Sequence, residues 1–232
     1  MTGPLDLPRV LIAAPASGHG KTTIASGLMA AMHASGHDVA PFKVGPDYID
    51  PGYHRLATGR SGRNLDPVMC GEDRVAPLLA HGAEGSKVSV IEGVMGLFDG
   101  RLNTEGFGSS AHVAHLTRSP IVLTVDVSHT SRTVAAWVHG LATFDPDLHV
   151  AGVVLNKAAT VRHADEAVRA VESTGIPVFG VLPRDEAIHV PSRHLGLVPV
   201  GERAEADVAM SRLADQIRTE VDVAAIAAVA NA

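Results

Sequence analysis

Two spacings of apolar residues alternate along this chain of 232 residues. Uninterrupted apolar runs, typical of strands buried on both faces, predict strands at 10–14, 38–43, 88–91, 120–125, 150–155 and 177–181. Apolar residues at helical spacing predict helices at 22–32, 73–81, 110–117, 132–141, 164–173 and 204–220. A long polar loop is expected at 44–67, and residues 221–232 fit either a fraying helix or the start of a linker. This alternation predicts an α/β fold, a mostly parallel sheet with helices on both faces.

A glycine-rich turn joins the first strand to the first helix. It reads Pro-Ala-Ser-Gly-His-Gly-Lys-Thr, the G-x-x-x-x-G-K-T pattern with Pro15 in place of the first glycine. A helix N-terminus offers free N–H groups to phosphate, a lysine here can reach the β- and γ-phosphates, and the threonine hydroxyl can hold Mg²⁺. A chance glycine turn is the alternative, which the flanking strand and helix disfavour. We therefore predict a nucleotide site formed by Ser17, Gly18, His19, Gly20, Lys21, Thr22 and Thr23.

Polar residues follow the predicted strands at their carboxyl ends, where ligands bind in open α/β sheets. These residues are Lys43, Asp47, Asp50, Glu92, Asp126, Asn156 and Arg184. Each one alone could be a helix cap or a turn residue. Asp47 and Asp50 lie in a loop framed by glycine and proline, which suits Mg²⁺ or substrate binding but also an Asx-turn pair. We expect Thr22, Asp47 and Glu92 to hold Mg²⁺.

Composition narrows the class of protein. The length suits one large α/β domain, and 46% hydrophobic residues provide a core. A net charge of −6, 3% aromatic residues and no long basic run argue against nucleic acid as a partner. The single cysteine, Cys70, excludes an internal disulfide and fits a reducing cytoplasm. No apolar stretch approaches the ~18 residues of a membrane span, and no signal-peptide pattern opens the sequence.

Four segments together resemble the cobyrinic or hydrogenobyrinic acid a,c-diamide synthase family. They are Ala40–Asp50 (APFKVGPDYID), Arg63–Asp66 (RNLD), Val90–Gly100 (VIEGVMGLFDG) and Arg193–Leu197 (RHLGL). The resemblance implies a P-loop NTPase fold similar to that of dethiobiotin synthetase. It also implies ATP-dependent conversion of two corrin acetate side chains to amides, through acyl phosphates. Members normally carry a second, C-terminal glutamine amidotransferase domain that supplies ammonia. We expect one synthetase domain here, spanning 1–232 with a core of about 9–221, and no amidotransferase domain.

The resemblance also implies roles for particular residues. Asp47, Asp50 and Asp99 would act near the substrate or Mg²⁺, together with Lys21 and with Lys43, which can offset two anions meeting in line. Asn156 and the Pro183-Arg184 turn would bind the adenine of ATP. Because the chain is acidic but the corrin substrate is a polycarboxylate, the stretch 51–65, which contains His54 and Arg60 and no acid, is predicted to face the anion. The expected substrate contacts are Tyr48, Arg55, Arg63 and Arg193.

Two other functions stay open at this point. One is another carboxylate-activating P-loop ligase, of the cobyric acid synthase or dethiobiotin synthetase type. The other is an ATPase switch similar to ParA or MinD, although those proteins typically place a lysine where this chain has Ala16. Ammonia is expected to come from an amidotransferase domain or subunit, because the acids around Cys70 disfavour a reactive thiolate. A homodimer and a cobalt-containing substrate are both left open.

Overall fold

The computed structural model describes residues 7–184 and 203–231. Within these ranges, seven strands form one sheet in the order β3-β2-β4-β1-β5-β6-β7, and each neighbouring pair is parallel. The strands are β1 (Arg9–Ala13), β2 (Val39–Val44), β3 (Arg63–Leu65), β4 (Val88–Glu92), β5 (Ile121–Asp126), β6 (Val150–Ala158) and β7 (Val178–Pro183). The predicted α/β class is confirmed.

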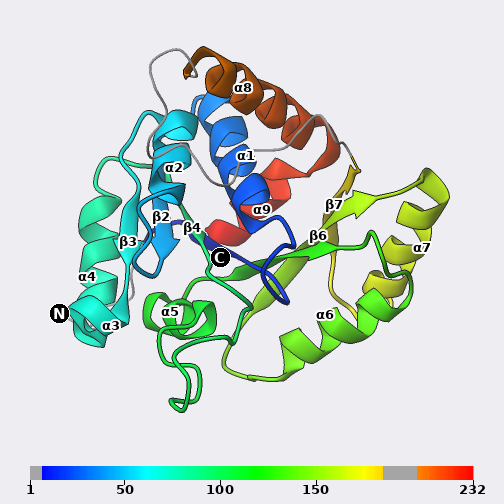
Figure 1. Cartoon of the computed structure of the whole chain (residues 1–232), viewed down its shortest axis with the longest axis horizontal. Helices are drawn as coiled ribbons and strands as arrows, with labels where there is room; N and C mark the ends of the chain where they lie inside the picture. Colours follow the sequence, from blue (N-terminus) through cyan, green and yellow to red (C-terminus); the bar gives the residue numbers. More distant parts are fainter. Residues whose placement is uncertain (1–6, 185–202, 232) are drawn as a thin grey trace.

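Helices connect the strands and cover the sheet. They are α1 (Lys21–Ala34), α2 (Asp50–Thr58), α3 (Pro67–Cys70), α4 (Glu72–Gly82), α5 (Ser110–Thr117), α6 (Thr133–Thr143), α7 (Val161–Glu172), α8 (Arg203–Glu220) and α9 (Val223–Ala230). Figure 1 shows α1, α2, α8 and α9 on one side of the sheet, with α5, α6 and α7 on the other. None of the helices in the described ranges is both long enough and apolar enough to cross a bilayer.

The two sides of the sheet have separate cores because successive strand residues point to opposite faces. In β1, Val10 and Ile12 pack against the side covered by α1 and α8, while Leu11 and Ala13 pack toward α4–α7. All four side chains are fully buried. This double burial explains why the strands appear in the sequence as uninterrupted apolar runs rather than as alternating patterns.

The expectation of a long loop at 44–67 is wrong. The segment contains α2, β3 and the start of α3. Pro51 occupies the first turn of α2, and Gly59 ends the helix in the left-handed conformation that glycine favours. The buried apolar residues of α2 are Tyr53 and Ala57, four positions apart. Two such residues are too few to give a helical pattern that can be recognised in the sequence.

The last segment is a packed helix rather than a fraying end or a linker. The side chain of Asp222 accepts a hydrogen bond from the N–H of Ala225 at 2.8 Å and thereby caps α9. Ile226 and Ala230, four residues apart, are buried in the core beside α1. An alanine-rich sequence shows no clear polar face, and for that reason the sequence left this segment open between a helix and a linker.

Strand order determines which loops meet. Because β1 lies between β4 and β5, the turn after β1 is flanked by the segments that follow those two strands. Ile12 pairs with Glu92, Glu92 with Lys43, and Asp126 with Asn156. The polar residues predicted at the strand ends therefore gather along the carboxyl edge of the sheet.

Candidate active site

The glycine-rich turn after β1 forms a phosphate-binding loop. Gly20 has φ +94°, and a Cβ atom there would lie 2.3 Å from Nδ2 of Asn156. Helix α1 begins directly after it, without a side-chain cap and without an acidic residue in its first turn. Its first N–H groups and the positive end of its dipole are therefore available to an anion.

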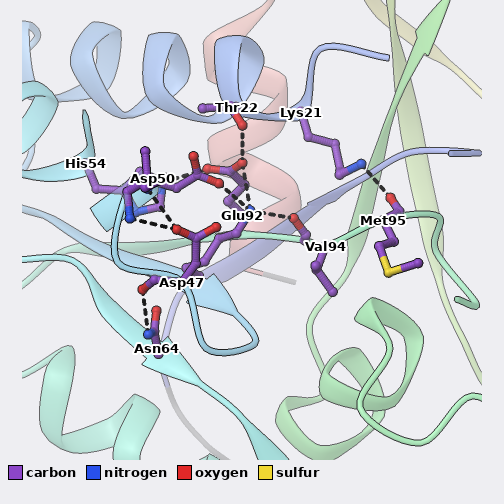
Figure 2. A network of polar contacts seen from close by, with 12 residues as sticks. Lys21, Thr22, Asp47, Asp50, His54, Asn64, Glu92, Val94 and Met95 are labelled. Carbon is purple, nitrogen blue, oxygen red and sulfur yellow. Dashed lines mark hydrogen bonds and ion pairs between the residues drawn. The ribbon is translucent and has the colours of Figure 1, made fainter. Parts of the chain in front are cut away.

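Lys21 lies at this helix start with its side chain largely buried. Its ammonium donates hydrogen bonds to the carbonyls of Ala16 and Met95, which tie it to the loop and to the segment after β4 (Figure 2). Burial lowers the pKa of Lys21 to about 8, and the nearby Lys43 ammonium acts in the same direction. A phosphate group at the loop would replace these carbonyl partners with a full negative charge.

Glu92, at the end of β4, is the centre of a buried polar cluster. Its Oε1 accepts hydrogen bonds from Thr22 Oγ1 at 2.6 Å and from Lys43 Nζ at 3.0 Å. Its Oε2 lies 2.7 Å from His54 Nε2, so the histidine donates from that nitrogen. Lys43 Nζ also lies 2.7 Å from Asp50 Oδ2. Figure 2 shows Thr22, Asp50 and His54 converging on Glu92 from α1 and α2.

The charges in this cluster stabilise one another. Burial alone would raise the pKa of Glu92, but the Lys43 ammonium and the hydrogen bond from His54 outweigh it, so the pKa is lowered. Burial would lower the pKa of Lys43, and the carboxylates of Glu92 and Asp50 raise it instead. For Asp50, burial and the neighbouring Glu92 raise the pKa to about 6. At neutral pH the cluster therefore holds a charged lysine between two carboxylates.

Asp47 and Asp99 hold the backbone of their own loops. Asp47 Oδ1 accepts from the N–H groups of Ile49 at 2.8 Å and Asp50 at 3.1 Å, which is the Asx-turn geometry left open from the sequence. The carbonyl of Asp47 accepts from Asn64 Nδ2 at 2.6 Å (Figure 2). Asp99 Oδ2 accepts from the N–H of Gly96 at 2.9 Å. Asp47 is near enough to raise the pKa of Asp50, and Asp99 is near enough to raise that of Lys21. Their action on substrate or Mg²⁺ stays a prediction.

A second set of contacts joins the phosphate loop to β5 and β6. Asn156 Nδ2 donates to the carbonyl of His19 at 3.1 Å, and the N–H of Asp126 donates to His19 Nδ1 at 2.9 Å. Lys157, in a left-handed conformation, pairs with Asp126 at 2.6 Å. Asn156 thus supports the loop, and its predicted contact with adenine is not tested by these bonds. Pro183 and Arg184 are exposed at the end of β7.

The residues of the stretch 51–65, which was predicted to face an anion, lie in different environments. Arg55 and Arg63 are exposed, as is Tyr48. Arg60, in contrast, donates to the carbonyls of Gly82 and Glu84, and His54 is fully buried against Glu92. His54 turns away from solvent because α2, which was not predicted, places it on the inner side of that helix; Arg60, just beyond the end of α2, is half-buried. Arg193 lies outside the described residues.

His54 is a site residue whose role the sequence did not reveal. Its Nδ1 is buried without a hydrogen-bond partner among the described residues, while Nε2 is committed to Glu92. Its signal was its position four residues after Asp50, which on a helix places both side chains on one face. That signal could have been used only if α2 had been predicted.

The oxygen atoms at this edge fit Mg²⁺. The hydroxyl of Thr22 and the carboxylate of Glu92 are hard oxygen ligands 2.6 Å apart at the phosphate loop. No group of three histidine, cysteine or acidic side chains in the described ranges forms a complete metal cage. Mg²⁺ commonly takes one or two protein ligands and completes its shell with phosphate oxygens and water. The assignment of Thr22, Asp47 and Glu92 as its ligands stays a prediction.

Comparison with known proteins places the chain in a family. Residues 10–198 match the family model described as the CobQ/CobB/MinD/ParA nucleotide binding domain. The chain belongs to this family. The predicted P-loop fold agrees with two solved structures, which show similarity of fold alone. They are the cell division ATPase MinD of Pyrococcus furiosus (TM-score 0.54, 16% identity, 92% of this chain and 99% of that one) and chloroplast FtsY from Physcomitrella patens (TM-score 0.56, 15% identity, 90% and 67%).

Curated relatives of this family member are much more similar in sequence. Hydrogenobyrinate a,c-diamide synthase of Thermobifida fusca is 56% identical over 227 residues, which are 97% of this chain and 48% of the relative. The protein of the same name from Streptomyces coelicolor is 53% identical, covering 97% and 46%. Cobyrinate a,c-diamide synthase of Gloeobacter violaceus is 46% identical, covering 94% and 46%. The resemblance predicted from the sequence is confirmed, and the chain spans about half the length of the curated relatives it matches.

Proposed function

We propose that this chain is the synthetase part of a corrin acid a,c-diamide synthase. In this reaction ATP activates two acetate carboxylates of hydrogenobyrinic or cobyrinic acid, and ammonia converts them to amides. The observation that carries the proposal is the cluster in which Glu92 joins Thr22, Lys43 and His54 directly beside the phosphate loop. The names of the relatives at 46–56% identity support the substrate.

The chemistry needs an activated carboxylate because oxide is a poor leaving group. A carboxylate oxygen attacks the γ-phosphorus of ATP, the bond to the β-phosphate oxygen breaks, and ADP leaves with that electron pair. The product is an acyl phosphate. Ammonia then attacks the acyl carbon and expels phosphate, with loss of a proton from nitrogen. Positioning and charge compensation are the main demands of phosphoryl transfer.

The described lysines suit those demands. In the first step two anions, the substrate carboxylate and the γ-phosphate, must approach each other. Lys43 is charged at neutral pH and is fixed between Glu92 and Asp50, so its position needs no rearrangement for the reaction. Lys21 would contact the β- and γ-phosphates from the helix start. Asp47, Asp50 and Asp99 would border the substrate carboxylate, with Tyr48, Arg55, Arg63 and Arg193 as the proposed substrate contacts.

Mg²⁺ would be held by Thr22 and Glu92, with Asp47 nearby, and would neutralise phosphate charge during transfer. The loop residues Ser17, Gly18, His19, Gly20 and Thr23 would surround the phosphates, while Asn156, Pro183 and Arg184 would contact the adenine. Ammonia would come from a glutamine amidotransferase domain or subunit, and the cytoplasm would be the compartment. We propose that residues 1–232 act as one ATP-binding synthetase domain.

The ATPase switch is not favoured as an alternative. Ala16 stands where ParA- and MinD-like proteins typically have a lysine, and its carbonyl is a partner of Lys21. The likeness to the solved MinD structure reflects the shared fold at 16% identity.

The nitrogen source gives a direct test. The purified chain with ATP, Mg²⁺ and hydrogenobyrinic acid should form amide with ammonium and none with glutamine. The only thiol in the sequence, Cys70, lies in α3 and donates from Sγ to the carbonyl of Asp66 at 2.7 Å. Glutamate release from glutamine that disappears in Cys70→Ser would contradict the proposal.

A further inference from the structure

An apolar hollow of about 520 Å³ opens beside the phosphate loop. Pro15, Ala16 and His19 of the loop form one wall, Phe98 of the segment after β4 forms another, and residues of α6 and its C-terminal end form the third. The volume lies within the ~300–1,000 Å³ typical of small-molecule sites.

Aromatic side chains gather in this hollow although the chain has few of them. The sequence contains one tryptophan and five phenylalanines. Trp137, Phe98 and Phe144 all line the hollow. Trp137 is 41% exposed and Phe144 is 75% exposed, which is a costly way to use large apolar surface unless something covers it. Phe98 and Phe144 are in contact, with ring centroids 4.7 Å apart.

Among the described residues that line the hollow, His19 is the one with a polar side chain and none is charged. His19 Nδ1 accepts from the N–H of Asp126, so the neutral ring carries its proton on Nε2. The ring also lies edge-on to Trp137 at 6.4 Å between centroids. An apolar surface with one N–H donor suits a flat, largely apolar ring system that carries oxygen-containing side chains at its rim.

The hollow is contiguous with the reacting groups. Ala16, in its wall, accepts a hydrogen bond from Lys21 at 3.2 Å. Phe98 directly precedes Asp99, and His19 directly precedes Gly20 of the phosphate loop. A molecule seated in the hollow therefore lies beside the phosphate loop and Lys21.

We propose that this hollow binds the face of the corrin macrocycle, with Trp137 and Phe144 as its main contacts. The inference rests on the proposed function and deepens it, since it assigns a surface to the part of the substrate that does not react. A concave hollow of this volume suits a small molecule, whereas a second copy of this chain would need a far larger surface of about 20–30 residues on each side.

Binding of hydrogenobyrinic acid, measured by calorimetry in the presence of Mg²⁺ and a non-hydrolysable ATP analogue, tests this inference. Trp137→Ala and Phe144→Ala should fold, because both side chains are exposed while the neighbouring Val134 and Val138 anchor α6. Each should weaken corrin acid binding by roughly tenfold to thirtyfold, as expected for a central aromatic contact. Trp137→Phe should recover most of the affinity. Val161→Ala, at an apolar side chain on α7 that is about as exposed as Phe144, is the control and should leave the affinity for the corrin acid unchanged.

Each other outcome has a distinct meaning. If the native chain binds the corrin acid and both alanine variants bind it within twofold, the assignment of the hollow is wrong while the proposed function stands. If the variants instead lose affinity for the nucleotide analogue, the hollow holds the base of the nucleotide. If their sedimentation changes while their affinity for the corrin acid does not, the hollow is a subunit interface. Either result overturns the inference. If the native chain binds the nucleotide but no corrin acid, the proposed function fails and this inference fails with it.

Discussion

Replacing Glu92 with glutamine removes one charge from the centre of the polar cluster while keeping the size of the side chain. The carboxylate has no exposed surface, and it accepts from Thr22, Lys43 and His54 within 3.0 Å. A glutamine amide has one accepting oxygen, so its NH₂ group must face either His54 or the pair formed by Thr22 and Lys43. If the NH₂ group faces Thr22 and Lys43, both lose their acceptor; if it faces His54, the histidine must move its proton to Nδ1, which has no partner among the described residues. In either orientation the ion pair with Lys43 is lost.

The structure allows the loss in the free energy of unfolding to be estimated. Removing one partner of a buried ion pair typically costs about 3–5 kcal/mol, whereas exposed pairs are worth about 0–1 kcal/mol. Asp50 remains 2.7 Å from Lys43 Nζ and still compensates part of the lysine's charge. We therefore expect a destabilisation at the low end of this range, about 3 kcal/mol. For a domain of this size that loss corresponds to a fall in Tm of roughly 6–12 °C.

Urea unfolding at pH 7, without nucleotide or metal, measures this cost. Glu84→Gln, at an acid whose side chain is 75% exposed, is the matched control and should not move the urea midpoint. In a Lys43→Met background the Glu92→Gln change should cost less, because its ion pair is already absent. A cost below 1 kcal/mol for Glu92→Gln in the native background would refute the view that Glu92 is a buried, charged centre of the site.

Three further predictions concern the phosphate loop. Lys21→Ala should abolish ATP hydrolysis with an unchanged circular dichroism spectrum, because the γ-phosphate loses its main cationic contact; near-normal turnover would contradict the assignment. ATP affinity measured without Mg²⁺ should be constant just below pH 8 and should fall above it by up to tenfold per pH unit. The reason is that Lys21, with a pKa of about 8, must then take up a proton to bind phosphate. Lys21→Arg should flatten this profile. Gly20→Ala should lower the free energy of unfolding, measured in urea, by about 2 kcal/mol and remove nucleotide binding, because a Cβ at φ +94° would lie 2.3 Å from Asn156 Nδ2. The control Gly140→Ala, in a helix with open space around this residue, should leave the stability unchanged or raise it.

The sheet and the phosphate loop could be predicted because their signals are local. Uninterrupted apolar runs such as Val10–Ala13 identify buried strands, and the spacing of Gly20, Lys21 and Thr22 identifies the loop. Strand order is a property of the whole fold, so the pairing of Ile12 with Glu92, which brings the acid to the loop, could not be obtained from spacing alone.

The helix α2 that was missed and the helix α9 that was left open have a common physical origin in weak local periodicity. Helix α2 has only Tyr53 and Ala57 as a buried apolar pair, and α9 has only Ile226 and Ala230. The missing α2 then changed the interpretation of His54, which was predicted to face an anion in solvent. On the helix it turns inward and becomes a partner of Glu92.

Transfer of oxygen from the substrate to phosphate tests the central claim most directly. Hydrogenobyrinic acid labelled with a heavy oxygen isotope in its carboxylates would be incubated with the chain, ATP, Mg²⁺ and ammonium, and both the corrin product and the released phosphate would be analysed by mass spectrometry. The account predicts amide formation with one labelled oxygen in the released phosphate for each amide, because an acyl phosphate loses its carboxylate oxygen to the phosphate. Hydrolysis of ATP without amide, or amide without label in the phosphate, would contradict it.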